Sequence, residues 1–484
     1  GADRDGYVLT NFPYLNNGPK DLIGNSGKGK EYAYRSYFGR VMYSYADRYL
    51  FQANIRHDGS SRFAKKHRWG TFPSFSAGWV LSEENFMKNL NWEWLSFLKI
   101  RATWGALGNE RIGDFPYMST IAFGNTIFYQ NNGIYFDQTA SQQKYAIENV
   151  TWEKTESTDI GLDISFLNNR LRVNGDYYWK NTKDMLLAMA IPDFLGFSDP
   201  DVNAGKMSTK GYELNVSWND HIGDFSYGIA INFSDFTSKM GDLQGTQFLG
   251  DKVKMEGSEF NEWYGYVSDG LFLTEEDLKN SPKINDKNTQ LGDIKYKDIS
   301  GPDGVPDGKI SPEYDRVLLG SSLPHFLYGG NINLGYKNFD LSLAFQGVGK
   351  QNARLAREMV EPFRNNYGNF PAIIDGNYWS PYNTDEQNAV AKYPRLTHVN
   401  KSSNYAMSDY WLFNGGYFRL KNITLGYTFP KEWMNAIGIK GARIYASASD
   451  LFCLSKYPKG WDPEMGVSEY PITTSILLGV SVNF

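Results

Sequence analysis

The chain has 484 residues, and its 49 Lys and Arg residues against 54 Asp and Glu residues give a formal net charge of −5. This mildly acidic balance, with no long basic run, argues against a nucleic-acid partner. The longest wholly apolar run covers only residues 185–191. A transmembrane helix needs about 20 predominantly apolar residues, so helical membrane spans are excluded. A membrane-spanning β-barrel is not excluded, because its strands show only weak, alternating hydrophobicity.

Apolar and polar residues alternate along most of the chain, which predicts β-strands with two different faces. The first predicted pair of strands flanks a turn at 46–48. The clearest pair, 159–166 and 171–179, flanks a tight turn at 168–169. Further turns of this kind are at 219–224 and 336–339. The pattern predicts roughly thirteen antiparallel strands in all.

Short and long connections alternate between these strands. The long segments are 58–72, 107–152, 183–207, 238–324, 349–414 and 453–472, which we predict to be irregular. Outer-membrane barrels have short periplasmic turns, long extracellular loops and aromatic residues at strand ends, and this chain matches all three. A soluble β-sandwich would explain any single hairpin, but it does not require every second connection to be long.

The last predicted strand alternates from Thr474 to the final residue, Phe484, and only Leu477 interrupts its polar face. It resembles the terminal recognition strand of outer-membrane barrels, which makes Phe484 a candidate barrel-recognition residue. If this strand ends on the periplasmic side, the strand count places residues 1–35 in an extracellular loop and 36–484 in the barrel. The same count predicts that more strands precede Gly1.

A series of short motifs follows in one order from residue 58 onward. They are DGSSRF at 58–63, WGTFPS at 69–74, LKIRATWG at 98–105, WEKT at 152–155, YWSP at 378–381, YPRL at 393–396 and YFRLKNITLGY at 417–427. Together they resemble the SusC/RagA-type TonB-dependent transporters of Bacteroidota outer membranes. The resemblance extends from about residue 33 to Phe484.

This resemblance implies the C-terminal portion of an all-β, antiparallel transmembrane β-barrel of about 22 strands, the size class that holds a plug. It implies a multi-pass barrel in the outer membrane of a Gram-negative bacterium, in contact with membrane lipid. The implied partners are an N-terminal plug-bearing portion of the same transporter, TonB acting through that portion, and a SusD-like surface lipoprotein that forms a lid.

The resemblance also implies import of oligosaccharides or oligopeptides, with no reaction catalysed on the ligand. Two other classes remain open: a non-transporting outer-membrane barrel that serves as an adhesin or anchor, and a secreted β-rich carbohydrate-active enzyme. We predict no catalytic residues. The 5 histidines are scattered without zinc-ligand spacing, and no G-x-S-x-G motif is present.

The segment 298–315 combines carboxylates with glycines and prolines. Hard oxygen ligands of this kind surround Ca²⁺ in EF-hand-like loops. The candidate ligands for Ca²⁺ or Mg²⁺ are Asp298, Asp303, Asp307 and Asp315. The alternative is a turn cluster that binds no ion. No other cofactor is predicted.

Aromatic residues in the two longest loop segments, 238–324 and 349–414, are candidates for contact with the ligand or the lid. They are Trp263, Tyr264, Tyr266, Tyr378, Trp379, Tyr382, Tyr410 and Trp411. Aromatic faces stack on ligand rings, but they also anchor loops against their neighbours. For each single residue, loop packing or lid contact is the alternative to ligand contact.

Overall fold

A computed structural model describes residues 2–4, 23–25, 31–130, 133–142, 145–189, 191–243, 245–364, 368–465 and 469–484. Most of the segment 1–35, predicted as an extracellular loop, therefore lies outside the described residues. Within the described ranges, no helix is both long and apolar enough to span a membrane.

Thirteen antiparallel strands form one sheet, in which each strand pairs with the next in chain order. They are β3 (Tyr34–Tyr45), β4 (Tyr49–Ser60), β5 (Trp69–Val80), β6 (Leu95–Asn109), β9 (Glu153–Phe166), β10 (Leu171–Lys183), β13 (Met207–Ile222), β14 (Phe225–Met240), β21 (His325–Tyr336), β22 (Phe339–Lys350), β25 (Tyr417–Thr428), β26 (Gly441–Ser455) and β27 (Ser475–Asn483). The sheet is a meander with β3 and β27 at its edges. The prediction of roughly thirteen antiparallel strands is confirmed.

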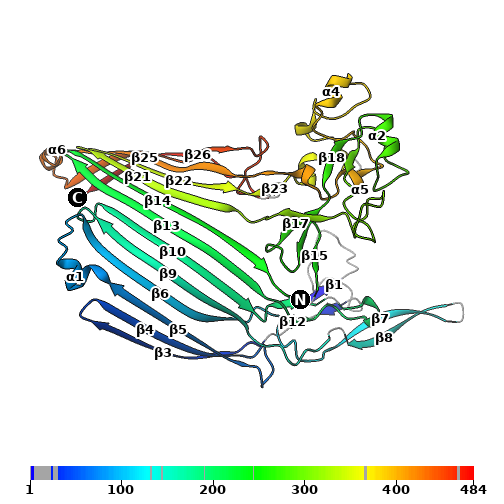
Figure 1. The fold of residues 1–484 in the computed structure, drawn as a ribbon, viewed down its shortest axis with the longest axis horizontal. Coiled ribbons are helices and arrows are strands. Elements are labelled where there is room, and N and C mark those ends of the chain that lie inside the picture. Colours follow the sequence, from blue (N-terminus) through cyan, green and yellow to red (C-terminus); the bar gives the residue numbers. More distant parts are fainter. Residues whose placement is uncertain are drawn as a thin grey trace.

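Figure 1 shows the strands side by side, with the short turns and the C-terminus at one end of the sheet. The helices α1 (Asn85–Lys88) and α6 (Lys431–Ala436) lie at this turn end. The β3–β4 turn places Ala46 and Asp47 at φ 52° and 53°, as a tight hairpin turn of the primed type requires. The predicted turn at 219–224 is tighter than expected, because β13 continues to Ile222.

The apolar face of this sheet is largely uncovered. Ile160, Ile231 and Leu478 are 50%, 47% and 81% exposed, and many other large apolar side chains of the strands are exposed as well. Soluble monomers rarely expose contiguous apolar surface on this scale. Such a face is expected where strands contact lipid.

The opposite face of the sheet carries paired charges. Arg101 on β6 contacts Asp159, Asp163 and Asp176 on β9 and β10, and the closest of these approaches, to Asp176, is 2.6 Å. Polar and charged side chains of this kind line the interior of outer-membrane barrels, where they face water or a plug.

The long connections between the strands carry structure of their own at the other end of the sheet (Figure 1). Their short strands are β7 (Ile121–Gln130), β8 (Gly133–Gln142), β11 (Leu186–Ala188), β12 (Asp201–Asn203), β15 (Gln247–Leu249), β16 (Lys252–Lys254), β17 (Glu262–Gly265), β18 (Ser268–Leu271), β19 (Ile294–Tyr296), β20 (Val317–Gly320), β23 (Asn352–Arg354) and β24 (Leu412–Asn414). Two further short strands, β1 (Ala2–Arg4) and β2 (Ile23–Asn25), precede the sheet. The helices of the long connections are α2 (Glu275–Asn280), α3 (Arg357–Val360), α4 (Asp385–Ala389) and α5 (Lys401–Asn404). The prediction of irregular structure is wrong for 107–152, 183–207, 238–324 and 349–414, because most of these elements are too short to show a periodicity in sequence. The described residues of 58–72 and 453–472 hold only the ends of the adjoining sheet strands.

We call the described residues of 238–324 and 349–414 together the loop head. Its helices and short strands gather beyond one end of the sheet (Figure 1). Ten buried apolar residues form its core: Tyr266, Leu271, Ile294, Tyr296, Ile310, Met359, Val360, Ile374, Tyr405 and Trp411. Both long connections contribute to this core, so they pack as one unit.

Candidate functional site

A buried carboxylate joins the two segments of the loop head. Asp293, from the first segment, is fully buried and accepts hydrogen bonds from side chains of the second. The Arg395 Nε lies 2.7 Å from one carboxylate oxygen, and the amides of Asn400 and Asn404 donate at 2.8 and 2.9 Å. The backbone N–H of Gln290 donates at 2.9 Å. Arg395 donates to both oxygens of this carboxylate and to the Asn288 carbonyl, and these hydrogen bonds hold its guanidinium in one orientation.

Two of the predicted contact aromatics belong to the core instead of the surface. Tyr266 and Trp411 are 6% and 2% exposed. The Trp411 Nε1 donates to the Asn404 carbonyl at 2.9 Å, and the Tyr266 N–H donates to the Met407 carbonyl at 2.8 Å. The structure therefore favours loop packing for these two residues.

Three more of the predicted aromatics are partly buried and make contacts between loops. Trp263 donates from its indole N–H to the Asn352 carbonyl at 2.6 Å. The Arg316 guanidinium lies 5.0 Å from the ring centre of Tyr264. Tyr410 donates from its hydroxyl to the Lys392 carbonyl at 2.8 Å, and burial raises the pKa of that hydroxyl.

The other three predicted aromatics line one groove on the loop head. Tyr378, Trp379 and Tyr382 lie along an open groove of about 590 Å³, within the range of small-ligand sites. The remaining lining residues are Glu275, Leu278, Gln290, Leu291, Ser380, Pro381, Arg395 and Leu396. The groove thus combines aromatic faces with one guanidinium that a buried carboxylate orients.

The groove side chains differ in how firmly they are held. Trp379 is anchored, since its backbone N–H donates to the Tyr393 carbonyl at 3.0 Å and its ring lies against Gly292. A Cβ at Gly292 would come within 2.3 Å of that ring, so only glycine allows this approach. Tyr382 is 96% exposed and free to contact an incoming molecule. Sequence reasoning missed Arg395 and Leu278, because the segments meet only in the folded chain.

The predicted cation ligands do not converge. Asp315 is fully buried and accepts from the backbone N–H groups of Ile299, Ser300 and Ser311 at 2.8, 3.2 and 2.7 Å. Its carboxylate therefore organises the loop by itself.

The other predicted ligands are also engaged or exposed. Asp298 accepts from the Gly308 N–H at 2.5 Å, Asp307 accepts from the Lys309 N–H at 3.0 Å, and Asp303 is exposed. Over the described ranges, no group of three or more His, Cys, Asp or Glu side chains is arranged to hold a metal ion. A Ca²⁺ or Mg²⁺ ion in this loop stays a prediction.

Phe484 directly follows β27 at the turn end of the sheet and is 83% exposed. The preceding residue, Asn483, accepts a hydrogen bond at its carbonyl from the Lys440 N–H at 2.8 Å. This contact fixes the end of the strand against the α6 connection. The role of Phe484 in barrel recognition stays a prediction.

An antiparallel meander with an exposed apolar face, a charged opposite face, short turns at one end and structured loops at the other defines an outer-membrane β-barrel wall. A family model described as "TonB dependent receptor-like, beta-barrel" matches residues 2–451. The chain belongs to this family. The family is one of outer-membrane transporters and not of enzymes, which excludes the carbohydrate-active enzyme.

Relatives named after TonB-dependent receptors align along most of the chain. "TonB-dependent receptor SusC" of Bacteroides thetaiotaomicron is 32% identical over 468 residues, which is 93% of this chain and 43% of that protein. "TonB-dependent receptor P3" of Formosa agariphila is 31% identical over 453 residues, covering 89% of this chain and 42% of that protein. The chain therefore spans less than half the length of these relatives.

Solved structures show the same fold. "Structure of the RagAB peptide transporter" matches with a TM-score of 0.79 at 23% identity, covering 99% of this chain and 51% of that chain. A state described as "open-open" matches with a TM-score of 0.77. At this identity the likeness shows the fold alone. The predicted SusC/RagA-type barrel portion is confirmed.

Proposed function

We propose that this chain supplies part of the barrel wall and the ligand-capturing loop head of a TonB-dependent importer of oligosaccharides or oligopeptides. One observation carries the proposal: an open groove with Tyr378, Trp379 and Tyr382 lies on the loop head of a transporter-family barrel, and that loop head packs around its own buried core. Both ligand classes suit aromatic faces beside polar groups. A relative named SusC and a fold neighbour described as a peptide transporter support one class of transporter and leave the ligand open.

We base the proposed binding partners on the chemical character of each surface of the chain. The exposed apolar face of the sheet suits contact with membrane lipid. The exposed groove suits contact with a SusD-like surface lipoprotein that closes over the ligand. We propose that a plug-bearing N-terminal portion of the same transporter fills the polar side of the sheet and transmits the action of TonB. A non-transporting adhesin would need neither the plug nor the lid.

The first test is extraction from outer membranes in mild detergent, followed by intact masses of everything that co-purifies. We expect this chain together with a plug-bearing portion, in the same polypeptide or a separate one, and a lipidated partner protein. The chain isolated with neither would overturn the importer. The plug-bearing portion without any lipoprotein would overturn only the lid.

A further inference from the structure

A second cleft, of about 600 Å³, lies where the loop head meets the end of the sheet. Its walls come mainly from three parts of the chain: Asp251, Lys252 and Trp263 near β16 and β17, residues 351–354 and 356–358 around β23 and α3, and the segment that follows β26. Ser322 also lines it. None of the three predicted groove aromatics, Tyr378, Trp379 and Tyr382, lines it. It is therefore a separate site.

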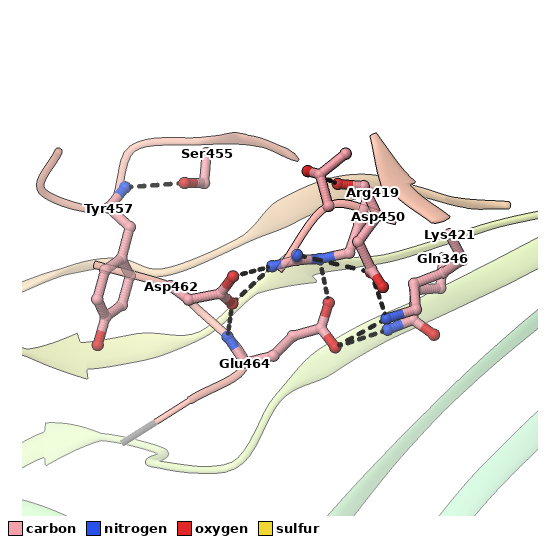
Figure 2. Close-up of polar contacts among 9 residues, drawn as sticks. Gln346, Arg419, Lys421, Asp450, Ser455, Tyr457, Asp462 and Glu464 are labelled. Carbon is pink, nitrogen blue, oxygen red and sulfur yellow. Dashed lines mark hydrogen bonds and ion pairs between the residues drawn. The ribbon is translucent and has the colours of Figure 1, made fainter. Parts of the chain in front are cut away.

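The third wall is fixed to the sheet by a buried arginine, which Figure 2 shows at the centre of a charge cluster. Arg419 on β25 has a side chain only 4% exposed and lies 2.5 Å from both Asp462 and Glu464. Lys421 contacts Asp450 on β26 at 2.7 Å. Gln346 on β22 donates to Glu464 at 3.0 Å.

This cluster places the cleft on the polar side of the sheet. Gln346 alternates along β22 with Ser342 and Asp340, and all three share the polar face. Glu464, which contacts Gln346, also lines the cleft. The cleft therefore lies beside the polar face of the sheet, which in the proposed importer faces the interior of the barrel.

The carboxylates of the cleft are already paired with cations. Asp251 contacts Arg354, Glu358 contacts Arg364, and Glu464 contacts Arg419. Each of these carboxylates therefore lies within ion-pair distance of a cation, which weakens its repulsion of an incoming anion.

Two cationic side chains of the cleft have donor groups that are not fully used by the partners within the protein. Among the described residues, Lys252 has no carboxylate within ion-pair distance; its ammonium lies 4.5 Å from the ring centre of Trp263. The Arg354 Nε is buried and has no hydrogen-bond partner among the described residues. Burial lowers the pKa of Lys252, as expected for a cation without a counter-charge. An unsatisfied buried donor destabilises the fold, and a bound acceptor would relieve that cost.

Contacts of neighbouring residues bring Lys252 and Arg354 close to each other. Asp251, which contacts Arg354, directly precedes Lys252. Lys252 pairs across the strands with Trp263, and the Trp263 indole bonds to Asn352, two residues before Arg354. An ammonium, a guanidinium N–H and an aromatic ring therefore meet around one space.

We propose that this cleft binds a carboxylate group of the imported ligand, with Lys252 and Arg354 as donors and Trp263 beside it. The inference rests on the import function proposed above and names its substrate class: oligomers that carry a free carboxylate. A peptide C-terminus and a uronic acid both present this chemistry. The groove lined by Trp379 and Tyr382 then holds another part of the same oligomer.

The test measures binding to the complete detergent-extracted transporter by isothermal titration. Two matched ligand pairs are compared: N-acetyl-trialanine against its C-terminal amide, and trigalacturonate against its methyl ester. We expect the acid to bind about tenfold more tightly than its neutral partner in one pair, as for a charge-assisted hydrogen bond. The discriminating pair identifies the source of the carboxylate.

The variant Lys252→Gln removes the charge and keeps most of the length of the side chain. We expect it to abolish the preference for the acid without changing binding of the neutral partner. Lys254→Gln is the matched control: Lys254 lies on the same strand, over the ring of Phe260 at 5.0 Å, and does not line the cleft. It should retain the full preference.

Equal affinity within both pairs, or the same preference in the Lys252 and Lys254 variants, overturns the carboxylate site and leaves the import function standing. Equally strong, Lys252-dependent binding of inorganic phosphate overturns the assignment to carboxylate. Transporter-bearing cells that take up no oligosaccharide or oligopeptide at all overturn the import function, and the carboxylate inference falls with it.

Discussion

The barrel wall and the loop head place the same types of residue in opposite environments. In the wall, large apolar residues such as Ile231 and Leu478 are exposed and charged residues such as Arg101 meet their partners on the other face. In the loop head, Trp411 and Met359 are buried in a core and Tyr382 is exposed. The loop head therefore resembles a small soluble domain carried on the wall.

The difference lies in the solvent on each side. Contact with lipid is favourable for exposed apolar side chains, whereas in water their burial is favourable. The environment of the chain changes from lipid to water at the loop end of the strands. Exchanging residues between the two settings is therefore informative, and the expected effects differ in size.

The largest effect is expected for Asp293→Ala in the loop head. The change leaves Arg395, which lies 2.7 Å from that carboxylate, without its partner, and loss of one member of a buried pair costs about 3–5 kcal/mol. Hydrogen exchange by mass spectrometry should show faster exchange in the loop head and unchanged exchange in the wall strands. Asp286→Ala, at an exposed site of the same segment, is the control. Equal exchange in both variants would contradict this prediction.

In the wall, neighbouring residues on opposite faces provide the next test. Ile231→Lys places a charge on the apolar face of β14, where lipid makes it cost about 2–4 kcal/mol near the membrane centre. Asn232→Lys changes the polar face of the same strand and should cost much less. Denaturant unfolding in lipid vesicles measures both. Equal losses of stability would mean that the two faces see the same solvent.

A smaller effect is expected in the groove. Tyr382→Ala removes a side chain that is 96% exposed, so the fold should not change. The loss of ligand binding should be about 0.5–1.5 kcal/mol, the range for an aromatic contact. Tyr470→Ala removes a tyrosine that is 81% exposed outside the groove and serves as the control. The same loss in both variants would show that the groove is not the contact.

The acidic loop offers a test within the loop head. The sequence predicts that Ca²⁺, added after chelation, gives a binding signal in isothermal titration and protects 298–315 from proteolysis. Asp303→Ala and Asp307→Ala should weaken that signal, and Asp286→Ala should not. Binding unchanged in the first two variants would assign the ion to other ligands, and no binding would leave a turn cluster organised by Asp315.

The smallest effect is expected on the local stability of α3 at acidic pH. The backbone N–H of Glu358 and the nearby Arg364 lower the pKa of the Glu358 carboxyl below its usual value of 4.5. A depressed carboxyl pKa stabilises the fold above the usual value, and that contribution disappears as the pH falls below 4.5. The protection of the α3 amides, measured as the ratio of the intrinsic to the observed hydrogen-exchange rate at each pH, should therefore fall as the pH falls below that value. Glu358→Gln should remove this pH dependence, and retention of it would point to another group.

The strands of the wall were predictable because their signal is local. Alternation along 159–166 and 171–179 predicts a hairpin, and the structure pairs Phe166 with Leu171 across that turn. The terminal strand was predictable for the same reason. The elements of the loop head were not, because α5 has 4 residues and β23 has 3, too few for a period to appear.

The candidate sites divide in the same way. Sequence reasoning found Trp379 and Tyr382 as loop aromatics but could not separate them from Tyr266 and Trp411, which the fold buries. It missed the partnership of Asp293 with Arg395 and that of Trp263 with Asn352, because each pair joins two different loop segments.

The sequence by itself determined a β-barrel wall of about thirteen strands, its two faces and its transporter family, because alternation and turns act over neighbouring residues. Only the tertiary structure decided which aromatics meet a ligand, which carboxylates are already paired and which cations remain available. Those properties depend on burial and on contacts between segments about a hundred residues apart, such as Asp293 and Arg395. No local pattern encodes such a meeting, because it is set by how the whole loop head packs.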